Sequence, residues 1–168
     1  MGNVRQMINV SDAELREGLM ASLAVPRWVD DVMAFSPFDS LESLLSTASD
    51  AATPLSATEI EGAISHHPRI GEMPIGEGVS QAFSRSEQAG LGDEDTDLAE
   101  SIRAGNEAYE ERFGRVFIVR ATGRSRAEIL SELERRLELP NSTELEIVGE
   151  QLRDIAVLRI EKLYGEQL

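Results

Sequence analysis

Residues 141–163 read NSTELEIVGEQLRDIAVLRIEKL, and this stretch decides the fold class. Helical positions advance by about 100° per residue, so side chains three or four positions apart share one face. Taking Leu152 as the reference, the apolar side chains that fall within about 40° of it are those of Leu145, Val148, Ala156 and Leu163. The stretch therefore predicts a long amphipathic helix with one buried side.

A charged residue interrupts this apolar face. Arg159 falls at about −20° from Leu152, in the middle of the stripe. A guanidinium in that position needs an anion, because a buried and unpaired charge is very costly. Two partners remain open from the sequence. One is an internal Asp or Glu, which is the more common arrangement, and the other is a ligand carboxylate, which fits the arginine fork.

The remainder of the chain repeats the pattern of helix-start signals followed by apolar residues at three- and four-residue spacing. Where Ser precedes Glu by three positions, we expect a capping box, in which each side chain bonds to the other residue's backbone N–H. The expected boxes are at Ser11, Ser56 and Ser125, and further helix starts are expected at Pro26, Asp39 and Asn141.

One stretch has strand character instead. Residues 116–119 read VFIV and lie between Gly114 and a turn at Gly123. A strand without a partner cannot form a sheet. The sequence therefore predicts an all-α, single-domain helical bundle over residues 1–168, with one short extended segment (116–119) crossing it.

Composition excludes several classes of function. The chain has 168 residues with 16 Lys plus Arg and 31 Asp plus Glu, a net charge of −15, which argues against binding nucleic acid or an anionic membrane surface. The absence of cysteine excludes a thiol nucleophile and an iron–sulfur cluster. No HExxH pattern or secretory signal occurs, and no apolar run is long enough to span a membrane. We therefore expect a cytoplasmic protein without a metal site.

Both histidines lie at the start of an irregular stretch, residues 66–78, which is rich in glycine and proline. If residues 59–67 are helical, His67 falls at about −20° from Ile60, whereas His66 points about 120° away. The imidazole of His67 is thus expected to share the apolar face. On geometry alone, a hydrogen-bonded core histidine is the alternative to a functional one.

A carboxylate is expected on the inner face of residues 79–91. There Glu87 falls at about +40° from Phe83. Because Ser84 precedes Glu87 by three positions, the two side chains could instead form a capping box, if a helix begins at Ser84. Taken together, an imidazole, a carboxylate and a guanidinium directed into one small domain need either mutual pairing or a small polar ligand.

These residues belong to a specific combination of motifs. The motifs are HPRIGE at 67–72, SRSEQAG at 84–90, NEAY at 106–109, RFG at 112–114, FIV at 117–119, GRS at 123–125 and LRI at 158–160. Over nearly the whole chain, this combination resembles the 2-oxo-4-hydroxy-4-carboxy-5-ureidoimidazoline (OHCU) decarboxylase family of urate degradation. The resemblance implies a cofactor-free, all-helical enzyme, usually a homodimer, that converts OHCU to (S)-allantoin and carbon dioxide.

The resemblance also assigns roles to individual residues. It implies that His67 is the catalytic acid or base and that Glu87 assists it at the substrate. The substrate contacts that it implies come from Pro68, Ser84, Gln88, Phe117, Ile118, Val119 and Arg159. Two alternatives remain open from the sequence: a non-catalytic helical module that binds a ureide or purine, and a structural bundle whose interior polar groups pair with one another.

Overall fold

The computed structural model describes residues 10–65 and 96–165. Within these ranges the chain forms helices joined by turns and one extended segment, with no strand, as the sequence predicts for an all-α protein. The helices are α1 (Asp12–Ser22), α2 (Pro26–Met33), α3 (Leu41–Ala51), α4 (Ala57–Ile64), α6 (Thr96–Phe113), α7 (Arg126–Leu137) and α8 (Asn141–Gly165). No helix in the described ranges is both long and apolar enough to cross a membrane.

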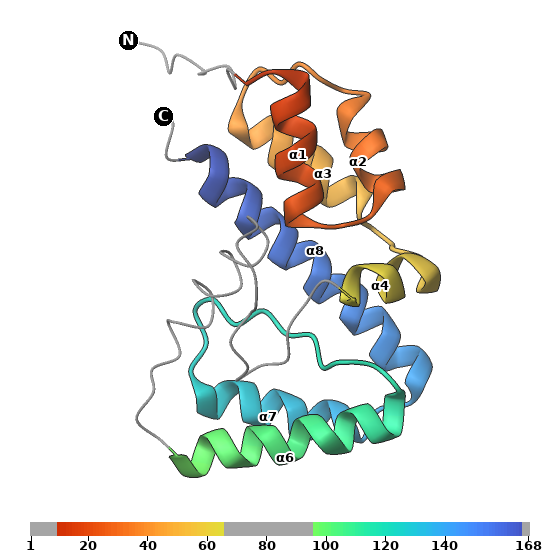
Figure 1. The fold of residues 1–168 in the computed structure, drawn as a ribbon, viewed down its shortest axis with the longest axis vertical. Helices are drawn as coiled ribbons and strands as arrows, with labels where there is room; N and C mark the ends of the chain where they lie inside the picture. Colours follow the sequence, from red (N-terminus) through yellow and green to blue (C-terminus); the bar gives the residue numbers. More distant parts are fainter. Residues whose placement is uncertain (1–9, 66–95, 166–168) are drawn as a thin grey trace.

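Helix α8 runs through the centre of the molecule (Figure 1). Helices α1, α3 and α4 pack against it, and α2 packs on α1 and α3. Helices α6 and α7 lie side by side below it and run in the same direction, because the chain between them crosses back over the length of the pair (Figure 1). The two turns that bound this crossing are made at Gly114 and Gly123, where the backbone φ angles are 71° and 80°.

The expected capping boxes explain where several helices begin. At Ser56 and Ser125 the box is complete, because each serine hydroxyl accepts from the backbone N–H of the Glu three positions on, and that Glu accepts from the serine N–H. At Ser11 the structure has the serine half of the box, a 3.1 Å bond from the Glu14 N–H to the Ser11 hydroxyl. These hydrogen bonds satisfy backbone groups that a helix leaves unpaired at its start.

Two other predicted helix starts have different outcomes. The start expected at Asp39 is two residues too early, because α3 begins at Leu41 and is capped by Ser40, whose hydroxyl accepts from the Ser43 N–H at 3.1 Å. Helix α8 does begin at Asn141 as predicted, but the Asn141 side chain accepts a 3.1 Å hydrogen bond from Arg115 Nη1. The side chains that border a helix start therefore also serve tertiary contacts.

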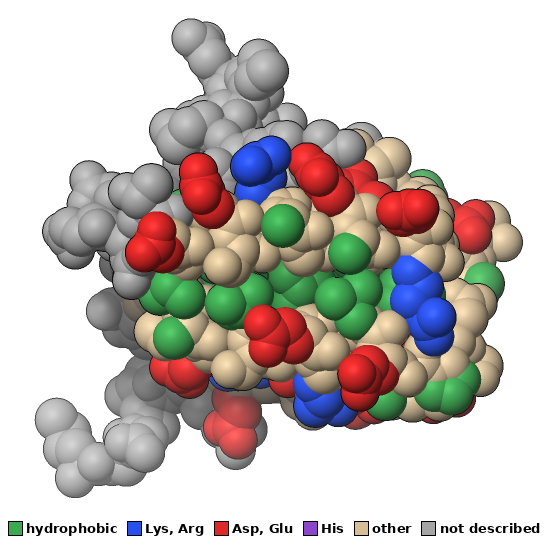
Figure 2. Space-filling view, turned by 90° about the horizontal axis from the view of Figure 1, so that it is seen from below, with side chains coloured by type: hydrophobic (Ala, Val, Ile, Leu, Met, Phe, Trp, Pro, Cys, Tyr) green, Lys and Arg blue, Asp and Glu red, His purple; other side chains and the backbone are tan. Residues whose placement is uncertain are grey.

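Apolar side chains gather in two clusters. The larger cluster lies between α8 and helices α1 to α4, and at its centre the buried Trp28 indole donates to the Ala48 carbonyl at 2.8 Å. The smaller cluster lies between α6, α7 and the crossing segment. Figure 2, seen from the side of α6 and α7, shows a band of apolar side chains bordered by acidic ones on this face. The helices of the pair approach closely at Gly105, where a Cβ would lie 2.4 Å from Leu133 Cδ2.

The crossing segment joins the two clusters. Phe117 and Val119 belong to the smaller cluster, whereas Ile118, between them in the sequence, belongs to the larger one. Side chains of an extended chain point alternately to opposite sides, and here both sides are buried. The predicted extended segment over residues 116–119 is thus confirmed, and its side chains enter both clusters.

Candidate active site

The described residues include part of the predicted site. Phe117, Ile118, Val119 and Arg159 are all buried. The side chains of residues 117–119 are taken up by the two clusters, so what this segment can offer to a small molecule is its backbone. The other predicted site residues lie outside the described residues: His67, Pro68, Ser84, Glu87 and Gln88.

The helix that leads toward His67 is shorter than the sequence suggests. Helix α4 ends at Ile64, and the Ser65 hydroxyl donates to the Gly62 carbonyl at 2.7 Å at this end. The expectation of one helix over residues 59–67 is therefore wrong, and the helical phase assigned to His67 does not follow from α4. Its direction toward the interior stays a prediction.

The buried stripe of α8 is confirmed. Val148, Leu152 and Ala156 are buried, and Arg159 lies on the same face with 3% of its surface exposed. Such a position places a full positive charge beside the larger cluster, where the surrounding medium screens it less than water does. The side chain is therefore suited to holding an anionic group, and the sequence alternatives of an internal acid and a ligand carboxylate both remain compatible with this burial.

The backbone of the crossing segment is held by side chains instead of by a neighbouring strand. The Ile118 carbonyl accepts a 2.7 Å hydrogen bond from Arg136 Nη1 of α7. Two residues later, the Arg120 N–H donates to Gln151 Oε1 of α8 at 2.8 Å. Buried backbone polar groups need hydrogen-bond partners. In a sheet an adjacent strand supplies them, and here the side chains of Arg136 and Gln151 do so.

Arg136 is part of a buried charged network. Arg136 and Glu144 are both fully buried, and Arg136 Nε donates to the two carboxylate oxygens of Glu144 at 2.9 and 3.0 Å. A further hydrogen bond joins Arg136 Nη2 to Glu144 Oε1. The Tyr109 hydroxyl of α6 donates to the same oxygen at 2.6 Å. Burial and then this bond to Glu144 raise the pKa of Tyr109 to about 12, so the phenol stays protonated as a donor.

Sequence reasoning missed this network, although a usable signal was present. Arg136 falls at about −20° from Ile129 on α7, which is the same phase argument that singled out Arg159. Glu144 falls at about −40° from Val148, within the buried stripe of α8. Both residues could have been identified as buried charges, but their pairing depends on how α7 and α8 meet.

An open hollow of about 570 Å³ lies between the end of α4 and the end of α6. Its lining residues are Glu61, Ile64, Ser65, Glu110, Phe113, Gly114, Arg115 and Val116. Two of these, Ser65 and Val116, immediately precede the stretches that begin with His66 and with Phe117. Among the described residues, the Nε and Nη2 atoms of Arg115 are buried without a hydrogen-bond partner, while Nη1 is bonded to Asn141. The hollow is thus lined by the last described residue before His66 and by the residue before Phe117, and it carries a cation at its wall.

The family model for OHCU decarboxylase matches residues 9–161 of this chain. The chain belongs to the OHCU decarboxylase family. The match covers residues 10–65 and 96–161 of the described ranges, and it also includes residues 66–95, where most of the predicted polar site residues lie. The matched range therefore includes every residue that the sequence predicts for the site.

Individual proteins named for OHCU decarboxylation or uric acid degradation are similar to this chain over most of its length. The mouse 2-oxo-4-hydroxy-4-carboxy-5-ureidoimidazoline decarboxylase is 33% identical, over 77% of this chain and 74% of its own length. The Arabidopsis uric acid degradation bifunctional protein TTL is 30% identical over 78% of this chain, which spans 41% of that longer protein. A crystal structure of OHCU decarboxylase in the presence of (S)-allantoin has 26% identity, a TM-score of 0.75 and covers 89% of this chain and 98% of that one.

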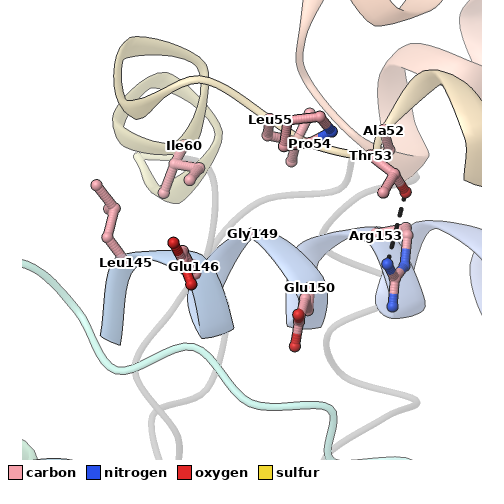
Figure 3. A pocket seen from close by; sticks show the side chains of 10 residues that line it. All are labelled: Ala52, Thr53, Pro54, Leu55, Ile60, Leu145, Glu146, Gly149, Glu150 and Arg153. Atoms are coloured by element: carbon pink, nitrogen blue, oxygen red, sulfur yellow. Dashed lines mark hydrogen bonds between the residues drawn. The ribbon is translucent and has the colours of Figure 1, made fainter. Parts of the chain in front are cut away.

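A second hollow in the described part lies away from these family residues. It has a volume of about 290 Å³ and lies between residues 52–55, α4 and the first half of α8 (Figure 3). Arg153 reaches across its end, with Nη1 at 3.5 Å from the Thr53 hydroxyl. The residues that line it include none of those predicted for the OHCU site. Among the described residues, no group of three His, Asp or Glu side chains is arranged to hold a metal ion.

Proposed function

We propose that this chain decarboxylates OHCU to (S)-allantoin in urate degradation. The family match over residues 9–161 is the observation that carries the proposal. The similarity to the mouse enzyme, which is named for this decarboxylation, and to a structure determined with (S)-allantoin supports the same substrate and product. The reaction also suits the described residues. An anionic substrate needs a buried cation and fixed polar groups, which Arg159 and the backbone of residues 117–119 can supply.

The proposed reaction needs no added electron acceptor. Cleavage of the carbon–carbon bond releases carbon dioxide and leaves its electron pair on the ring carbon. That pair is delocalised into the adjacent ring C=N bond, whose nitrogen takes up a proton. The carbon that lost the carboxylate then becomes a carbonyl as its hydroxyl loses a proton, and the neighbouring ureido-bearing carbon is protonated, which gives allantoin. Because the substrate itself accepts the electron pair, we propose that the enzyme works without a cofactor and contributes binding, orientation and a proton.

Each named residue has a place in this proposal. Arg159 binds an anionic or carbonyl edge of the substrate, and its burial strengthens that contact. The backbone of residues 117–119 lines the pocket. His67 handles the proton, so its position on one side of the ring determines which enantiomer forms, while Glu87 orients the carbinol hydroxyl. The smaller contacts are assigned to Pro68, Ser84 and Gln88.

The decisive experiment is circular dichroism of freshly generated OHCU with and without the protein. We expect the protein to accelerate decay and to give (S)-allantoin, whereas spontaneous decay gives the racemate. In His67→Asn we expect most of the rate to be lost while allantoin still stabilises the fold against heat. Optically pure product at a near-parental rate from this variant would contradict the role of His67. A parental protein that binds allantoin without turnover would instead favour a ureide-binding module.

Arg159→Lys tests the binding role separately. Lysine keeps the charge but loses the fork, so we expect KM to rise more than kcat falls. Arg153→Lys on the same helix is the matched control, because Arg153 lies at the other hollow and should leave both constants near the parental values. An unchanged KM in Arg159→Lys would contradict the proposed clamp.

We further propose that residues 1–168 form a single domain in the cytoplasm and, from the family resemblance, that it assembles as a homodimer. The chain has a mass of 18.4 kDa, so sedimentation analysis distinguishes the monomer from a species of twice that mass. A monomer at the protein concentrations of the activity assay would contradict the proposed assembly.

A further inference from the structure

We propose that Arg136 is a positioning residue for this reaction, holding the Ile118 carbonyl so that the backbone of residues 117–119 is oriented to bind the substrate. The inference rests on the proposed function, in which that backbone lines the pocket. Arg136 itself does not touch the substrate in this account. It acts through the peptide group that it holds.

The guanidinium is fixed on every side by described residues. Its Nε and Nη2 atoms are bonded to Glu144 of α8, and its Nη1 atom is bonded to the Ile118 carbonyl at 2.7 Å. The guanidinium carbon lies 4.6 Å from the centre of the Phe117 ring, a cation–π contact with the residue before Ile118. Glu144 is held in turn by the Tyr109 hydroxyl. The donor that meets the Ile118 carbonyl therefore has one well-defined direction.

The packing of its side chains does not fix the direction of the peptide groups of the crossing segment. The segment therefore needs a fixed hydrogen-bond donor. Phe117 and Ile118 anchor their side chains in opposite clusters, which sets the faces of the segment. The peptide N–H and C=O groups point along its edges, between these faces, and a neighbouring strand would normally hold them. Here Arg136 holds the Ile118 carbonyl and Gln151 holds the Arg120 N–H. Together they determine which edge groups remain for a ligand.

Stability alone does not explain why a fully buried ion pair is present. Removing two charges from water costs free energy, and replacing a buried pair with well-packed apolar side chains is often neutral or stabilising. An apolar replacement could fill the space between α7 and α8, but it could not donate to the Ile118 carbonyl. We therefore separate two effects of the pair by experiment: its effect on the free energy of unfolding, and its effect on the orientation of the Ile118 carbonyl.

The experiment is the double variant Arg136→Met/Glu144→Leu in the full chain. We expect it to fold, because both charges leave the interior together, with a melting temperature lowered by the loss of the partners of the Ile118 carbonyl and the Tyr109 hydroxyl. We expect kcat/KM for OHCU to fall by about 100-fold, as for a displacement of about 1 Å at a binding group, with the larger part in KM. Arg135→Met is the matched control, since Arg135 is the next residue on α7 and pairs with Glu132 at the surface. The kcat and KM of the Arg135→Met variant should stay at the parental values.

The outcomes separate the two proposals. A folded double variant whose kcat/KM stays within about threefold of the parent would overturn the positioning role of Arg136. If the double variant does not fold, Arg136→Lys, which keeps the charge beside Glu144 but loses the fork, is judged by the same criterion. A parental protein that does not form (S)-allantoin would refute the proposed function, and the inference with it, before any variant is compared.

Discussion

The contact between α6 and α7 at Gly105 allows a sharp test of the packing. Adding a methyl group in Gly105→Ala would place the new Cβ 2.4 Å from Leu133 Cδ2 and 3.1 Å from Leu133 Cγ. Favourable carbon–carbon contacts lie at about 3.5–4.0 Å, so one of the two helices has to shift by about 1 Å. Leu133 is fully buried in the smaller cluster and has no solvent to turn into.

Two effects of opposite sign set the magnitude. Overpacking of a buried site costs about 1–3 kcal/mol. Replacing glycine by alanine within a helix gains about 1 kcal/mol, because alanine loses less backbone entropy on folding. We therefore expect Gly105→Ala to lower the free energy of unfolding by about 1 kcal/mol. For a chain of this length that corresponds to a melting temperature lower by about 2–4 °C.

Thermal unfolding followed by far-ultraviolet circular dichroism measures this change. Gly62→Ala in α4 is the matched control, because among the described residues nothing lies within 4 Å of a Cβ at that position. At that position only the higher helix propensity of alanine acts, and we expect the free energy of unfolding to rise by about 0.5–1 kcal/mol. A Gly105→Ala variant that is as stable as the parent, or more stable, would show that the Leu133 side chain can move aside and would refute this reasoning.

Two further predictions concern pH. Burial raises the pKa of Tyr109 to about 12 and also raises the pKa of Tyr164 above its ordinary value of 10.0. The stability from the raised pKa of Tyr109 is present below about pH 10 and lost as pH rises toward 12, and because both pKa values are raised, ultraviolet titration should show less phenolate at pH 10 in the native protein than in the unfolded chain. The Arg27 hydrogen bond lowers the pKa of Glu59 from 4.5 to about 2. Its stabilisation, up to about 1 kcal/mol for a partly exposed pair, is lost as pH falls between these values, and Glu59→Gln should flatten that part of the melting profile.

Much of the fold follows from local signals in the sequence. The capping-box spacing predicts the helix starts at Ser56 and Ser125. The apolar stripe of α8 predicts the burial of Arg159. Asp39 shows the limit of this reading, since two adjacent residues can both cap a helix and the observed cap is Ser40. Local spacing therefore locates a helix to within about one or two residues, and the contacts decide the last position.

The parts that escaped prediction depend on contacts between distant segments. Each of Arg136 and Glu144 is recognisable as a buried charge by its helical phase, but neither sequence neighbourhood says that the two meet. The VFIV segment has no alternation of apolar and polar residues, because both of its faces are buried. The sequence thus indicates that the segment is buried, but only the three-dimensional arrangement shows which cluster each side chain joins.

The alternation along residues 117–119 has a consequence for how this region tolerates change. A single residue inserted between Gly114 and Phe117 would rotate every following side chain to the opposite face, exchanging the occupants of the two interiors. Replacement of one apolar side chain by another of similar volume disturbs one interior only. The spacing between the bounding turns is therefore a stricter requirement than the identity of the side chains between them, and deletions here should be more harmful than conservative substitutions.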